Sequence, residues 1–219
     1  MTPLAVDVVS DVVCPWCYLG KRRLERALTL VPGVSIAVRW RPYQLDASVP
    51  PEGMDRKDYI VRKFGSLQAI EPAHRRLEEY GLAEGLEYRF DRITRAANTI
   101  NAHRVIRWAG TGGREEAMVE RLFAANFTEG RGIGDPTELA RLAAEVGLDA
   151  DAVASHLATD EDRAAVLAEI ENAYRVGVTG VPCFILAGRY AVMGAQAAET
   201  IADAIRQVAT EQAEPAPAK

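Results

Sequence analysis

Two cysteines separated by two residues give this sequence its clearest candidate for chemistry. Cys14 and Cys17 enclose Pro15 and Trp16, where a valine-rich stretch gives way to a helical pattern. A cysteine at a helix N-terminus lies beside unpaired backbone N–H groups, which favour the thiolate over the thiol. We therefore expect Cys14 to be an exposed nucleophile. Cys17, one turn inside the helix, is placed to resolve a mixed disulfide formed at Cys14.

Helix electrostatics limit how acidic the first thiol can become. A helix dipole contributes about 2 kcal/mol at most, which moves a thiol pKa from about 8.5 to roughly 7. Four cations follow in the helix, but the first lies about 10 Å along the axis, beyond a screening length of about 8 Å, so we expect little from them. They are Lys21, Arg22, Arg23 and Arg26. Pro15 suits the first turn of a helix, and Trp16 offers a flat apolar surface to a ligand.

A Cys-x-x-Cys pair is also half of a zinc site. Zinc needs two further ligands, and the other cysteine and histidine residues show no second paired spacing. These residues are Cys183, His74, His103 and His156. We therefore predict no metal, and inert burial of both thiols stays open as the other alternative.

The hydrophobic pattern around the pair predicts a β-α-β unit. Residues 4–9 and 34–40 are rich in Val and Ile and indicate strands. Between them, residues 18–31 carry Leu and Ala at helical spacing, and Pro32 and Gly33 then stop the helix. A unit of this length is typical of a parallel sheet with a right-handed crossover.

The rest of the chain predicts a long helical block followed by a β-β-α ending. Residues 55–174 are predicted helical almost throughout, without a convincing strand. Strands are indicated at 183–186 and 190–193, with Gly188 between them, and a helix at 197–209.

The composition points away from nucleic-acid and membrane partners. Of 219 residues, 26 are Lys or Arg and 31 are Asp or Glu, which gives a formal net charge of -5. Such a chain is not attracted to phosphate backbones or anionic lipid. No stretch approaches the roughly 18 to 20 apolar residues of a membrane span. Residues 1–10 lack the basic start of a secretory signal peptide. Three cysteines are too few for a framework of disulfides. We therefore expect a cytoplasmic protein.

Four motifs follow one another over nearly the whole chain. They are residues 11–17 with Gly20, residues 98–99 with 102–104, residues 177–182, and residues 194–196. Together they resemble the DsbA-type thioredoxin-like oxidoreductases and, within that family, the cytoplasmic FrnE-like branch. The resemblance implies an α/β, thioredoxin-like fold (β-α-β … β-β-α) with a large all-helical insertion.

The resemblance also implies a division into domains. A discontinuous thioredoxin-like core would comprise residues 1–46 and 162–210. A helical insertion domain would comprise residues 47–161, and residues 211–219, which contain Pro215 and Pro217, would form a disordered tail.

In this family the peptide bond between Val181 and Pro182 would be cis and would face the cysteines. The backbone of Val181 would then offer hydrogen bonds to an extended substrate, and Pro182 would keep metal from the thiols. Together with Pro15 and Trp16, these residues form the substrate-binding surface that the resemblance implies.

In relatives the segment that matches the second motif lies on the insertion near the active-site groove, so the resemblance implies this place for Asn98 and His103. His103 would tune Cys14 or contact a ligand there. As a lone histidine on an apolar helix, it suits equally a structural group hydrogen-bonded to a neighbouring loop. Asp11 suits a cap for the active-site turn, with buried proton transfer as its alternative.

Cys183 departs from the family pattern, since relatives usually carry an aromatic or aliphatic residue directly after the proline. One interpretation is a small buried hydrophobic group on a core strand. The other is a third thiol within reach of Cys14, able to form an alternative disulfide.

These residues predict a thiol-disulfide oxidoreductase acting on a protein or small-molecule substrate. No resident cofactor is expected, and glutathione enters as a redox partner or co-substrate. The alternative is a glutathione-dependent, kappa-like transferase or isomerase resembling 2-hydroxychromene-2-carboxylate isomerase, whose relatives typically carry Ser where this chain has Cys14. A non-enzymatic binding module or chaperone is the third hypothesis. The direction of exchange and the oligomeric state, a homodimer included, stay open.

Overall fold

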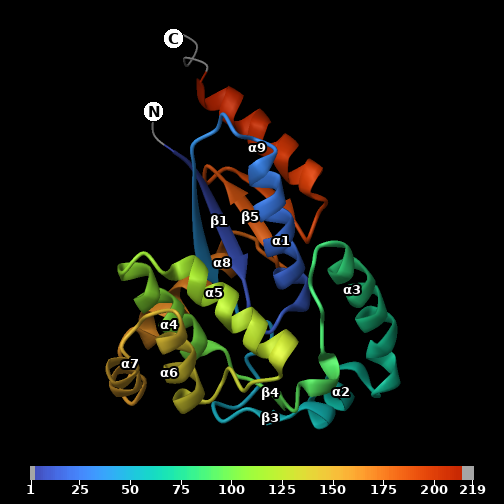
Figure 1. Ribbon diagram of the computed structural model, residues 1–219, viewed down its shortest axis with the longest axis vertical. Coiled ribbons are helices and arrows are strands. Elements are labelled where there is room, and N and C mark those ends of the chain that lie inside the picture. Colours follow the sequence, from blue (N-terminus) through green and yellow to red (C-terminus); the bar gives the residue numbers. More distant parts are fainter. Residues whose placement is uncertain (1–2, 214–219) are drawn as a thin grey trace.

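A four-stranded sheet lies at the centre of the computed structural model, which describes residues 3–213 (Figure 1). The strand order is β2-β1-β5-β6; β1 and β2 run parallel, and the other neighbours pair antiparallel. The strands are β1 (Leu4–Ser10), β2 (Ile36–Pro42), β5 (Cys183–Leu186) and β6 (Tyr190–Met193). Helices α1 (Pro15–Thr29) and α9 (Ala198–Ala213) cover one face, and α8 (Arg163–Arg175) covers part of the other.

The central strand β1 carries apolar side chains to both faces of the sheet. Val6 and Val8 are buried in the main core with residues of α1 and α9. Val9 packs instead with Ala173 of α8. Successive residues of a strand point to opposite faces, so a strand covered by helices on both sides reads as a nearly continuous run of valine.

The insertion between β2 and α8 is mostly helical and packs beside one end of the sheet (Figure 1). Its helices are α2 (Arg56–Phe64), α3 (Glu71–Ala83), α4 (Ile100–Thr111), α5 (Glu115–Ala124), α6 (Pro136–Glu145) and α7 (Ala150–Leu157). Shorter helical turns occupy Gln68–Ile70, Phe90–Arg92 and Ala125–Glu129.

The prediction of an all-helical insertion is wrong in one detail. Two short strands, β3 (Met54–Asp55) and β4 (Arg95–Ala96), pair antiparallel within it. Strands of two residues are too short to show an alternating pattern, and their partners lie about forty residues apart in the sequence.

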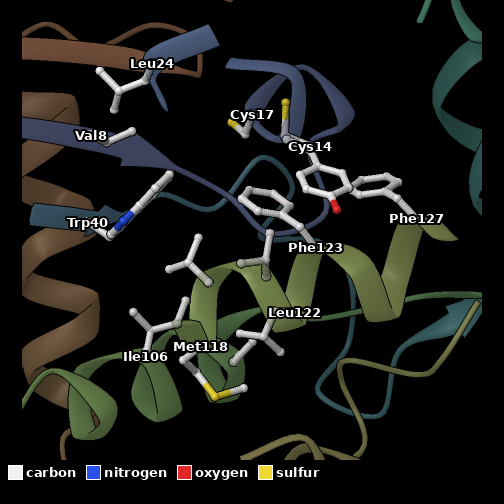
Figure 2. Packing of buried hydrophobic residues seen from close by; sticks show 14 of the residues in the cluster. Val8, Cys14, Cys17, Leu24, Trp40, Ile106, Met118, Leu122, Phe123 and Phe127 are labelled. Atoms are coloured by element: carbon white, nitrogen blue, oxygen red, sulfur yellow. The ribbon is translucent and has the colours of Figure 1, made fainter. Parts of the chain in front are cut away.

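One hydrophobic cluster runs from the sheet into the insertion without a break. Leu24 of α1, Trp40 of β2 and Phe123 of α5 all belong to it (Figure 2). The ring of Tyr18 stacks on Phe123 with 5.0 Å between centroids. Such a pair contributes about 1 kcal/mol beyond its buried area, so the insertion directly holds α1.

Helix α1 begins at Pro15 with Cys14 as its N-cap, as the placement of the cysteine pair predicts, although the apolar repeat itself starts only at residue 18. One element end differs from the sequence prediction. Helix α9 extends to Ala213, so the predicted start of the tail at 211 is wrong; Glu211 accepts hydrogen bonds from Gln207 and Tyr190 at this end. The remainder of the predicted tail, residues 214–219, lies outside the described residues. The domain boundaries stay predictions.

Within residues 3–213, none of the helices has both the length and the apolar character needed to cross a membrane.

The contact between α1 and the loop before β5 leaves no room for a side chain at Gly20. A Cβ there would lie 2.7 Å from Cγ of Pro182 and 3.3 Å from Cζ of Phe184. We predict that Gly20→Ala lowers the free energy of unfolding by about 1 to 3 kcal/mol, the usual cost of overpacking, despite alanine's better helix propensity. Chemical denaturation measures this change. Gly33→Ala, with nothing within 4 Å of its Cβ, is the control; equal stability of both variants would contradict the packing argument.

Candidate active site

The two cysteines lie side by side at the start of α1 (Figure 2). Cys14 is the N-cap residue with extended backbone, and Pro15 is the first residue of the helix. The Cys17 backbone N–H donates to the Cys14 carbonyl at 3.0 Å, which closes the first turn. Both cysteines are free thiols. The pair therefore has the close approach that a reversible disulfide requires.

The expected open exposure of Cys14 is wrong. Cys14 is 4% exposed and Cys17 1% exposed. Cys14 is buried in the main hydrophobic cluster, which also contains Tyr88 of the insertion. Tyr88 donates a hydrogen bond to the Pro15 carbonyl at 2.7 Å. The thiol of Cys14 donates to the carbonyl of Val181 at 3.7 Å, in a contact that is only partly buried. Cys14 is thus the less enclosed thiol of the pair.

Burial raises the pKa values of the other two thiols, Cys17 and Cys183, above that of an ordinary cysteine. Removal from water, followed by the neighbouring Cys14 thiol, raises the pKa of Cys17 well above its usual value. The Ser10 hydroxyl and the Asp11 backbone oppose this only in part. Burial also raises the pKa of Cys183. Cys17 and Cys183 are therefore protonated at neutral pH.

The peptide bond between Val181 and Pro182 is cis, and this segment lies against the active-site turn. Pro182 is buried, whereas Val181 is half-buried. On the other side of the turn, Pro15 and Trp16 are half-buried, and the Trp16 ring meets Tyr80 of α3 edge-on at 6.2 Å. Apolar and backbone groups thus surround the opening to Cys14. Their role in substrate binding stays a prediction.

Asp11 and His103 lie beneath the turn rather than at its opening. Asp11 is fully buried and its carboxylate accepts the backbone N–H of Leu45 at 2.8 Å. Nε2 of His103 is 2.9 Å from the carbonyl of Tyr43 and 3.5 Å from Oδ1 of Asp11. These contacts correspond to the structural alternative for His103, a histidine bonded to a neighbouring loop.

The side chain of Asp11 does not cap the helix. Helix α1 has no side-chain cap, and it is the backbone carbonyl of Asp11 that accepts the Cys14 N–H, at 2.9 Å. The carboxylate is used instead to hold the loop that follows β2, and sequence spacing alone cannot distinguish these two uses.

Asn98 connects the insertion to the same loop. Its side-chain amide donates to the Val49 carbonyl at 2.8 Å and accepts the backbone N–H of Ile100 at 3.2 Å. Both ends of the amide are therefore engaged, at the start of α4. A role in substrate binding stays a prediction for Asn98 as well.

Two features of the site were not predicted from the sequence: the position of Tyr88 and the burial of Lys21. Tyr88 stands in a loop between helices, and only its position among Phe90 and other aromatic residues distinguished it. Lys21 is 2% exposed and forms ion pairs with Glu25, Glu116 and Glu120. The expectation that Lys21 adds little to the thiol chemistry is consistent with this, because its charge is neutralised by carboxylates of α1 and α5.

Cys183 lies on the far side of the sheet from the α1 cysteines. It is fully buried and packs with Val9, Ala173 and Val178. The next residue, Phe184, points towards Gly20 of α1, so strand alternation turns Cys183 the other way. Its surroundings are those of a small buried hydrophobic group. In the part of the chain from residue 3 to 213, no three His, Cys, Asp or Glu side chains are grouped to hold a metal.

A parallel β-α-β unit, an antiparallel β-β-α ending and a dithiol at the first helix define a thioredoxin-like α/β fold. Residues 5–206 match the model of the DSBA-like thioredoxin domain, and the chain belongs to that family. Its fold is thus the thioredoxin-like fold with a helical insertion between strands, as predicted.

Individual proteins show the same relationship. The structure of the probable DsbA oxidoreductase SCO1869 from Streptomyces coelicolor is 34% identical, covers 99% of this chain and 93% of its own, and has a TM-score of 0.86. The uncharacterized protein YwbO of Bacillus subtilis (strain 168) is 29% identical over 91% of this chain and 94% of its own length. A 2-hydroxychromene-2-carboxylate isomerase shares the fold at 20% identity, with a TM-score of 0.73 over 95% of this chain and 98% of its own.

The different enclosure of the three thiols predicts selective alkylation. Thiolates react with iodoacetamide and thiols do not, so the raised pKa values and full burial of Cys17 and Cys183 protect them. We expect the reduced, folded protein at neutral pH to gain one adduct, on Cys14, detected by peptide mass spectrometry. The Cys14→Ser variant should gain none, and unfolding in guanidinium should expose all three. Early modification of Cys17 or Cys183 in the folded protein would contradict this order.

Proposed function

We propose that the protein is a thiol-disulfide oxidoreductase in which Cys14 is the nucleophile and Cys17 the resolving thiol. The observation that carries the proposal is the asymmetry of the pair: Cys14 caps α1 at the partly open edge, and Cys17 is sealed one turn inside. A pair of this kind can capture a substrate sulfur at one position and release it from the other.

The reaction balances as two successive exchanges. The Cys14 thiolate attacks one sulfur of a substrate disulfide, the substrate S–S bond breaks, and the first substrate sulfur leaves as a thiolate. The proton of Cys17 passes to the departed substrate thiolate, and the Cys17 thiolate attacks Sγ of Cys14. The Cys14–Cys17 disulfide forms, the second substrate sulfur leaves, and the substrate has gained two electrons. The reverse sequence oxidises a dithiol substrate through the same mixed disulfide.

The chain's own groups support each step. Backbone N–H groups of the first turn of α1 favour negative charge on Cys14. The Val181 carbonyl, which accepts the Cys14 thiol in the free protein, is released when that thiol ionises. Residues around the opening, namely Pro15, Trp16, Val181 and Pro182, then bind the backbone and apolar groups next to the substrate sulfur. Asn98 and His103 support this surface from the insertion.

We further propose that the protein belongs to the FrnE-like branch and works in the cytoplasm. The four motifs of that branch, the small number of cysteines and the likeness to a probable DsbA oxidoreductase over almost the whole chain support this assignment. The substrate is a protein or small-molecule thiol or disulfide, and glutathione is the redox partner or co-substrate. Nucleic acid and membrane are not partners in this proposal, which leaves assembly into a homodimer open.

Catalysed reduction of insulin by dithiothreitol tests the roles of the cysteines. We expect Cys14→Ser to fall to the uncatalysed rate, because the attacking sulfur is lost, and Cys17→Ser to lose turnover, because captured substrate is not released. Cys183→Ala is the matched control and should retain the wild-type rate, since this thiol lies on the other face of the sheet. Undiminished turnover by Cys14→Ser would refute the assignment.

A glutathione-dependent isomerase is the second candidate, favoured by the shared fold with 2-hydroxychromene-2-carboxylate isomerase. That chemistry uses the thiolate of glutathione and has no need of a resolving cysteine. We expect neither wild-type protein nor Cys17→Ala to isomerise 2-hydroxychromene-2-carboxylate in the presence of glutathione, as followed by absorbance. Full isomerase activity in Cys17→Ala, together with tight glutathione binding, would replace the oxidoreductase proposal.

A further inference from the structure

A cavity of about 930 Å³ lies between the core and the insertion, apart from the opening to Cys14. It is lined by residues of β1, α1, β2, α4, α5 and α8. Pro15, Trp16, Val181 and Pro182 do not contribute to its wall, whereas His103 does. Its volume is within the range of roughly 300 to 1,000 Å³ that small-molecule sites occupy. The mechanism proposed above makes no use of it.

One part of the wall is apolar. Leu24 of α1, Trp40 of β2 and Ile106 of α4 contribute the larger side chains, and Figure 2 shows the Trp40 indole with Leu24 on one side and Ile106 on the other. These side chains come from three separate elements, so the hollow is formed by the packing of the insertion onto the core. A hydrocarbon or aromatic group would find a complementary surface here.

The other part of the wall is charged, with an excess of carboxylates. Three cations line it, namely Lys21, Arg41 and Arg107, and each is already held by carboxylates. Five carboxylates line it, namely Glu25, Glu115, Glu116, Asp162 and Glu169. Four of these five form ion pairs with Lys or Arg.

Glu115 is the fifth carboxylate of the cavity wall. In the described residues 3–213 it has no ion pair; its Oε2 accepts only the backbone N–H of Trp40, at 3.3 Å. Burial raises its pKa, and the Trp40 backbone N–H and the charge of Arg41 oppose this only in part. The cavity therefore presents a carboxylate without an ion pair among the described residues, beside an apolar surface.

We propose that this cavity binds a small organic cation, a primary amine carried on an apolar body. The ammonium group pairs with the Glu115 carboxylate, and the apolar body packs against Leu24, Trp40 and Ile106. The Trp40 indole, whose N–H is held by Glu116 at 2.7 Å, is fixed in place to receive it. An anion is disfavoured, because every cation of the wall is already neutralised.

Isothermal titration calorimetry with three probes of similar size tests the proposal on the full chain with its thiols reduced. The probes are phenylbutylamine, phenylbutanol and phenylpentanoate. We expect the amine to bind about tenfold more tightly than the alcohol, as a charge-assisted hydrogen bond provides, and the carboxylate to bind least. Glu115→Gln keeps an acceptor for the backbone N–H of Trp40 but removes the negative charge. This variant should lose the preference for the amine over the alcohol.

Two further variants separate charge from general effects on the fold. Glu87→Gln removes a carboxylate whose side chain is 72% exposed and that lies outside the cavity wall, so it should leave the preference unchanged. Val38→Trp fills the cavity from β2 and should weaken binding of all probes, with circular dichroism confirming the fold. Equal binding of amine and alcohol, a preference that survives Glu115→Gln, or no binding of any probe to the wild-type protein would each overturn the proposal.

Discussion

The first two turns of α1 are held from two sides, and the chemistry of the site depends on these contacts. From the insertion, Tyr88 donates a hydrogen bond to the Pro15 carbonyl. From the core, Pro182 fits so closely against Gly20 that no side chain could be added there. Between these contacts the backbone N–H groups of the turn remain beside Cys14, while Cys17 is excluded from water. The difference between the two thiols is thus a consequence of packing and does not require a nearby cation.

The interface between α1 and α5 stabilises this arrangement. Tyr18 stacks on Phe123, and the buried Lys21 is surrounded by carboxylates from both helices. Taking an ammonium group out of water is costly, and loss of one partner of such a cluster leaves an uncompensated buried charge, typically at a cost of about 3 to 5 kcal/mol. The interface between α1 and α5 therefore favours one position of the insertion relative to the core. The same position forms the cavity at Glu115, so the active-site turn and the proposed amine site share a structural origin.

Elements with a local signal could be predicted from the sequence, and features created by distant contacts could not. The strands of the core followed from runs of valine and isoleucine, and the dithiol from its spacing. Three features depend on residues remote in sequence. They are the two-residue strands at Met54 and Arg95, the hydrogen bond from Tyr88 to Pro15, and the partners of Asp11 and His103. Cys14 illustrates the limit: its place at the helix start was predictable, but its low exposure was not, because the hydrophobic cluster that buries it includes residues of the insertion.

Trapping of the mixed disulfide tests most directly whether Cys14 captures and Cys17 releases. Reduced wild-type protein and the Cys17→Ser variant are exposed to oxidised glutathione, and the products are identified by intact mass and peptide mapping. The account predicts that the variant accumulates one glutathione on Cys14, whereas the wild-type protein proceeds to an internal Cys14–Cys17 disulfide. Glutathione attached to Cys183, or a stable adduct on Cys14 in the wild-type protein, would contradict it.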